Sequence, residues 1–359
     1  MFALDLPADN LLYLVLYLVT LMLHVVAMNY VVGGAMVVAG ATVYRVVGNY
    51  CDATRSIVAV IKDWLPLALG VTITLGVAPI LFIQLLYKHA FYTANLLLFH
   101  RWMAILPVLI IAFYLLYLQK SAWIERRSQL VRALVALGVL AMFLFVAWSW
   151  SENHLLSLAS QQEWTEHYAA GRMWYETPET LPRLLLWMIG SLSTLSVLVA
   201  WQLRGSASST TVRRLALVGL SGAVGSVLAA GWYWAALPEA VRTAIAEPAN
   251  LSLVIGGGVG LAVFVAAWVQ MARSGRMPAM LLWLATGGMA IAIPCATLLR
   301  EVRRYVALVE VGHWQPAVEA TQDSAQLGGF GVFLLFFVLN AAAIAWVLRR
   351  VAQQLQHNA

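Results

Sequence analysis

The sequence predicts an all-α fold, a polytopic transmembrane helix bundle, from three observations. Of the 359 residues, 62% are hydrophobic and only 11% are charged, whereas a soluble globular domain carries roughly 25% charged residues. The apolar residues fall in long runs, and a run of about 20 crosses a bilayer as a helix because no water inside can pair with a bare backbone. The charged residues gather at the ends of these runs. We therefore expect one integral membrane domain over 1–359.

Nine apolar segments are predicted to span the membrane. They lie at 20–44, 64–86, 95–118, 129–150, 184–203, 212–234, 249–272, 278–299 and 328–348. The first apolar stretch, 11–43, is longer than one span needs when a helix rises about 1.5 Å per residue. Its start is therefore expected to lie along or above the outer interface.

The basic residues predict the orientation. Connections after the odd-numbered spans, together with the C-terminal tail, hold 14 of the 22 Lys and Arg residues. They are Arg45, Arg55, Lys62, Lys120, Arg126, Arg127, Arg132, Arg204, Arg213, Arg214, Arg273, Arg276, Arg349 and Arg350. Because Lys and Arg accumulate on the cytoplasmic side, nine spans place the N-terminus outside and the C-terminus in the cytoplasm. The chain is predicted to lie in the bacterial cytoplasmic (inner) membrane.

Two long connections, 151–183 and 300–327, lie on the predicted outer side and are rich in aromatic and charged residues. Such loops often contact partners or carry function. An aromatic belt at the interface with solvated charges explains the same composition, so both interpretations stay open. The charged members include Glu152, Glu163, Glu166, Glu301, Arg303, Arg304 and Glu310.

Several function classes find no support in the sequence. The net charge of +6 comes from small basic groups beside apolar runs, without the aromatic-interleaved basic stripe of a nucleic-acid binder. Cys51 and Cys295 form no metal or c-type haem motif. There is no P-loop, nucleophile elbow or H-E-x-x-H pattern, and no catalytic residue is predicted.

His24 is the only histidine clearly inside an apolar span. An ionisable side chain in hydrocarbon is a candidate site by default, and a neutral imidazole is a normal axial ligand of haem iron. Gly33 and Gly34 on the same helix allow another helix or a flat macrocycle to come close. Ligation of a b-type haem iron, a hydrogen bond to a neighbouring helix and a contact with quinone are the three interpretations.

Two further groups are candidate cofactor-binding residues. Gln84, His89, His100 and Arg101 flank the connection between the second and third spans, where they are candidates to bind the carbonyl oxygens of a quinone; interfacial anchoring is the alternative. Glu310, close to His313 just beyond the eighth span, is a candidate for proton relay or iron ligation. A solvated loop is the alternative there.

Several short patterns resemble subunit I of the cytochrome bd quinol oxidases. His24 is followed by a small-residue stretch at 34–36 and by Thr-Val-Tyr at 42–44, similar to the first span of that family. Gly76, Phe82 and Gln84 are similar to its second span, and the Trp-Ser-Trp at 148–150, followed by Asn153, to its fourth. Segment 310–316, Glu-Val-Gly-His-Trp-Gln-Pro, resembles an element before its last span. The resemblance implies nine spans, an outside N-terminus and haem ligation by His24.

The sequence also departs from that family. Span 95–118 contains no acid where the family has two glutamates, no histidine lies in 182–187 where the family ligates haem, and only 204–213 stands in place of the long quinol loop. We therefore expect this subunit not to reduce oxygen itself.

The resulting hypothesis is a bd-like subunit of an electron-transfer complex, a candidate quinol-linked oxidoreductase, that handles quinone or b-type haem near the outer face. Other membrane subunits, outer-face redox proteins such as c-type cytochromes, and lipid are its expected partners, and nucleic acid is not. A non-redox membrane scaffold or anchor for redox partners and a small-solute transporter are the alternatives.

Overall fold

The computed structural model describes residues 6–49, 51–324 and 330–357, and the regular structure in these ranges is helical. The helices are α1 (Ala8–Val47), α2 (Asp52–Leu86), α3 (Lys88–Leu97), α4 (Phe99–Lys120), α5 (Ala122–Glu125), α6 (Gln129–Leu156), α7 (Gln161–Ala169), α8 (Thr180–Gln202), α9 (Ser209–Ala236), α10 (Glu239–Ala246), α11 (Pro248–Ser274), α12 (Ala279–Glu310), α13 (Trp314–Ser324) and α14 (Phe330–His357). The predicted all-α bundle is confirmed.

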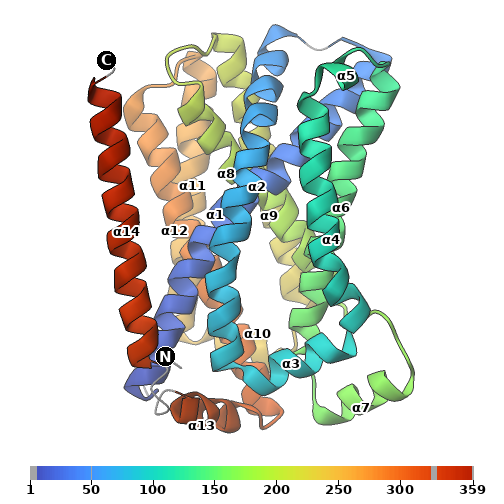
Figure 1. Cartoon of the computed structure of the whole chain (residues 1–359), viewed down its shortest axis with the longest axis vertical. Helices are drawn as coiled ribbons and strands as arrows, with labels where there is room; N and C mark the ends of the chain where they lie inside the picture. The colour runs from blue at the N-terminus through green and yellow to red at the C-terminus, as the bar shows by residue number, and fades with distance from the viewer. Residues whose placement is uncertain (1–5, 50, 325–329, 358–359) are drawn as a thin grey trace.

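Eight helices of the described part are long and apolar enough to cross a membrane: α1, α2, α4, α6, α8, α9, α11 and α12. Each corresponds to one of the first eight predicted spans. The predicted ninth span, 328–348, begins outside the described residues. Inside them, α14 contains a shorter apolar run, Leu334–Ala343. Figure 1 shows α14 at the edge of the bundle, running between its two ends.

Several helices extend well beyond the predicted spans. Helix α1 has 40 residues and is therefore about 60 Å long, twice the roughly 30 Å of a hydrocarbon core. Helix α6 continues to Leu156, α8 begins at Thr180 and α12 continues to Glu310. Large parts of the predicted loops 151–183 and 300–327 are thus helix, although 325–327 lie outside the described residues.

Short helices cover one end of the bundle, which we term the capped end: α3, α7, α10 and α13 (Figure 1). The start of α1 lies at this end, while α5 lies at the other (Figure 1). The predicted third span, 95–118, is divided here, because α3 ends at Leu97 and α4 begins at Phe99. A capping box between Ser160 and Glu163 starts α7, which satisfies backbone N–H groups at its first turn.

Neighbouring helices pack closely where small residues face each other. A Cβ added at Gly260 of α11 would lie 2.6 Å from the carbonyl oxygen of Gly288 on α12, so the two backbones are in direct contact there. Apolar side chains also remain on the outside, among them Leu81 and Leu228. An exposed apolar surface is expected of a bundle whose solvent is lipid.

Candidate functional site

His24 is half-buried on α1 and is held by helix α2. Its Nδ1 lies 3.0 Å from the carbonyl oxygen of Thr72. A carbonyl only accepts, so Nδ1 carries the proton and Nε2 keeps its lone pair. Gly76, one turn further along α2, lets the imidazole lie against the backbone, since a Cβ there would be 2.8 Å from Cε1 of His24.

This arrangement fits one axial ligand of a haem. Histidines that bind metal usually donate their other ring N–H to a carbonyl or carboxylate, which fixes the ring and its tautomer. His24 has this arrangement through Thr72. Within the described residues, no group of three or more His, Cys, Asp or Glu is arranged to hold a metal ion.

A layer of buried ion pairs lies between His24 and the capped end. Arg303 of α12 donates from Nη2 and Nε to Glu179, the residue that precedes α8, at 2.8 and 3.1 Å. The Tyr233 hydroxyl of α9 donates to the same carboxylate at 3.4 Å. Glu179 is 5% exposed and Arg303 is 9% exposed, so the pair joins three helices inside the protein.

The second pair of this layer is on α12 itself. Arg304 donates to both carboxylate oxygens of Glu301 at 2.9 and 2.8 Å. The hydroxyls of Tyr17 and Tyr87 each donate to Glu301 at 3.3 Å. Burial, together with the charge of Glu301, raises the pKa of Tyr87 well above its ordinary value. Tyr87 therefore remains a neutral donor at physiological pH.

Arg101, one of the predicted quinone-binding residues, belongs to a third pair. It contacts Glu152 of α6 at 3.1 Å, and the Trp148 indole donates to the same carboxylate at 2.7 Å. His100 is exposed and Gln84 is half-buried on α2. Among the described residues, neither His100 nor Arg101 forms a hydrogen bond or ion pair with Gln84, so the structure does not assemble the three into one polar site.

His154 and Arg183 form a buried contact in the same layer. Nη1 of Arg183 lies 2.9 Å from Nδ1 of His154. Arg183 is 3% exposed and His154 is 4% exposed. The Arg183 guanidinium lies 5.5 Å from the Trp187 ring centroid, and that of Arg300 lies 5.9 Å from the same ring. Arg300 is also within electrostatic range of His24 and His154.

An aromatic cluster covers this layer at the capped end. His313 stacks on Trp164 with centroids 4.8 Å apart, and His89 lies 5.8 Å from His313. Burial, followed by the proximity of His89, lowers the pKa of His313. Glu310 is exposed at the end of α12, and no hydrogen bond or ion pair joins it to His313 in the described part of the chain.

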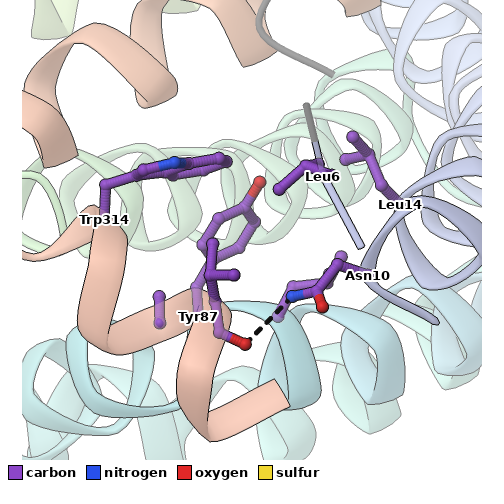
Figure 2. A pocket seen from close by; sticks show the side chains of 8 residues that line it. Leu6, Asn10, Leu14, Tyr87 and Trp314 are labelled. Carbon is purple, nitrogen blue, oxygen red and sulfur yellow. Dashed lines mark hydrogen bonds between the residues drawn. The ribbon is translucent and has the colours of Figure 1, made fainter. Parts of the chain in front are cut away.

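Two small cavities lie beside this cluster. One, of about 60 Å³, is lined by residues that include Lys88, His89 and His313. The other measures about 10 Å³, the room of a single water molecule. Figure 2 shows Trp314, Tyr87 and Asn10 around it, with Asn10 donating to the Val318 carbonyl at 3.1 Å.

The buried ion pairs are the feature that sequence reasoning missed. For Glu152, Glu301, Arg303 and Arg304 the interpretation as solvated loop charges is wrong, because all four are buried. One signal was available: Arg300, Arg303 and Arg304 are spaced i, i+3, i+4 directly after an apolar run, a spacing that places side chains on one helical face. Exposed Glu163, Glu166 and Glu310 do fit the solvated interpretation.

No family model, curated protein or solved structure matches this chain.

Proposed function

We propose that the chain is an integral subunit of a membrane electron-transfer complex that binds a b-type haem through His24. The supporting observation is the geometry of His24: the Thr72 carbonyl holds Nδ1 at 3.0 Å, which leaves Nε2 available as a ligand atom. When bound, a haem supplies one-electron redox chemistry. The chain itself would contribute the His24 ligand, its orientation through Thr72 and the charged layer next to it.

Quinone is the second proposed ligand of the same subunit. Arg101 is half-buried with Glu152 and Trp148 at the capped end. Glu152 is fully buried, and a buried carboxylate is a candidate to accept a proton released during quinol oxidation, while Arg101 stabilises its charged form. Of the quinone candidates, Arg101 has this support, whereas Gln84 and His100 are not joined to it.

The proposal includes nine spans with the N-terminus outside and the C-terminus in the cytoplasm. Helix α14 has 28 residues, which corresponds to about 42 Å and exceeds the hydrocarbon thickness. It runs from the capped end to the opposite end of the bundle (Figure 1). Counting α14 with the eight apolar helices makes the number odd, as the basic-residue pattern requires.

We further propose that the subunit does not itself reduce oxygen. Helix α4 contains no Asp or Glu, and the start of α8 presents Arg183 and Trp187 without a histidine. Redox partners, including outer-face proteins of the c-type cytochrome class and other membrane subunits, would complete the electron path. Exposed Tyr168 and Trp174 at the capped end are residues of the kind enriched in protein interfaces.

A reduced-minus-oxidised absorption spectrum of the purified chain tests this function. We expect a b-type signal in the wild type and its loss or shift in His24→Ala, with unchanged helix content by circular dichroism. His100→Ala is the matched control, because His100 is exposed at the capped end and should leave the spectrum unaltered. Absence of haem from the wild type, or an unchanged spectrum in His24→Ala, would exclude haem ligation by His24.

A further inference from the structure

The buried layer at the capped end carries an excess of positive charge. Arg303 is paired with Glu179 and Arg304 with Glu301, and the Arg101 and Glu152 pair is separate. The other two basic residues of the layer are Arg183 and Arg300. Neither forms an ion pair among the described residues. Arg183 is buried and Arg300 is half-buried. A buried charge without a counter-charge is strongly unfavourable, which favours the binding of an anion here.

Around the contact of His154 with Arg183, three buried N–H donors have no hydrogen-bond partner. Arg183 has only donors, so Nη1 must donate to Nδ1 of His154. The neutral imidazole then carries its proton on Nε2, and that N–H has no acceptor. Nη2 of Arg183 and Nε of Arg300 also lack partners. Three unused N–H groups call for a group that only accepts hydrogen bonds.

These donors come from three helices that meet at one place. His154 ends α6, Arg183 begins α8 and Arg300 lies on α12. The guanidinium groups of Arg183 and Arg300 both lie within 6 Å of the Trp187 ring centroid, so the two arginines are neighbours of the same side chain. His154 and Arg183 are more than nine-tenths buried, so bulk anions in water do not satisfy them.

We propose that Arg183, Arg300 and Nε2 of His154 form a binding site for one oxyanion group, a carboxylate or a phosphate. Arginine favours both because its planar fork matches two oxygens. The carboxylate would come from a haem side arm, since Arg300 is in electrostatic range of His24, and the phosphate from a membrane lipid. The site itself does not depend on the haem, because either source supplies the missing charge.

Native mass spectrometry of the detergent-purified chain tests the site. We expect one haem or one phospholipid per wild-type chain, identified by its mass. Arg183→Gln and Arg300→Gln are expected to lower that occupancy about tenfold or more, as loss of one partner in a buried charged contact does. Arg172→Gln is the matched control, since Arg172 is exposed at the same end and should retain wild-type occupancy.

The outcomes separate this site from the proposed haem ligation. A wild-type chain that carries neither molecule, or Gln variants that retain full occupancy, would overturn the oxyanion site. A phospholipid lost from both Gln variants supports the site even if no haem is found. Haem lost in His24→Ala, with haem and any phospholipid fully retained in Arg183→Gln and Arg300→Gln, supports the proposed function and overturns the site. If a Gln variant loses its helix content, its occupancy is set aside, and the other Gln variant and the occupancy of the wild-type chain test the site.

Discussion

Arg303 and Glu179 are 124 residues apart in the chain and form a two-point ion pair, with distances of 2.8 and 3.1 Å. The pair ties the capped-end part of α12 to the start of α8, and both side chains are almost fully buried. A buried charge of this kind becomes very unfavourable when its partner is removed.

Glu179→Gln is therefore expected to destabilise the chain by about 3 kcal/mol or more, because it leaves the Arg303 guanidinium buried without a counter-charge. Thermal unfolding in detergent, followed by circular dichroism at fixed protein concentration, measures the change. Asp52→Asn is the control: Asp52 and Arg55 form an exposed pair, and its loss should cost under about 1 kcal/mol. Equal effects of the two substitutions would contradict the structural role of the buried pair.

Gly76→Ala is expected to displace the His24 imidazole. The added Cβ would lie 2.8 Å from Cε1 and 3.0 Å from Nδ1 of His24, closer than van der Waals contact allows. A b-type spectrum should weaken or shift, together with a small loss of stability. Gly70→Ala on the same helix is the matched control, since its Cβ meets no atom within 4 Å. An identical spectrum in Gly76→Ala would show that the ring position does not matter to the cofactor.

Cys51 is expected to react with alkylating reagents at neutral pH. Hydrogen bonding by the Thr54 hydroxyl lowers the pKa of this exposed thiol to about 7, and the thiolate is the reactive form. The alkylation rate should reach half its maximum near pH 7, and Thr54→Ala should shift that midpoint upward. Cys51→Ser should abolish the labelling, because Cys295 is half-buried within α12. A midpoint unchanged by Thr54→Ala would rule out this hydrogen bond as the cause.

Acidification is expected to destabilise the capped end through His313. Burial lowers the pKa of His313 in the folded chain, so below about pH 6.5 the unfolded chain takes up a proton that the folded chain does not. Stability is therefore complete above that pH and falls as the pH drops toward the lowered pKa. The melting temperature of His313→Gln should decrease less between pH 7 and pH 5 than that of the wild type. A parallel decrease in both proteins would show that His313 does not contribute.

The C-terminus is expected to lie in the cytoplasm. A fluorescent-protein fusion at the C-terminus should be bright, and an alkaline phosphatase fusion at the same point should be inactive, since each reporter works on one side only. The basic residues of the end opposite the capped end predict this orientation. Phosphatase activity of the fusion would require an even number of spans and would refute the nine-span topology.

The bundle and the positions of its first eight spans were predictable because a bilayer leaves the backbone no alternative to a helix. Hydropathy reports where lipid surrounds the chain, but not where a helix ends inside protein. Arg300, Glu301 and Arg304 therefore looked like the start of a loop, although α12 continues through them to Glu310. The division of the third span at Leu98 had no hydropathy signal either.

His24 was recognisable from sequence alone, because one imidazole in an apolar run is a local fact that needs no knowledge of its neighbours. Its partner Thr72, the close approach of Gly76, and the meeting of His154, Arg183 and Arg300 were decided by tertiary packing. These contacts join helices distant in sequence, and charge type alone does not specify which acid neutralises which base. Burial in a medium of low polarity makes each unpaired donor costly, and only the packed helices determine which donors remain unpaired.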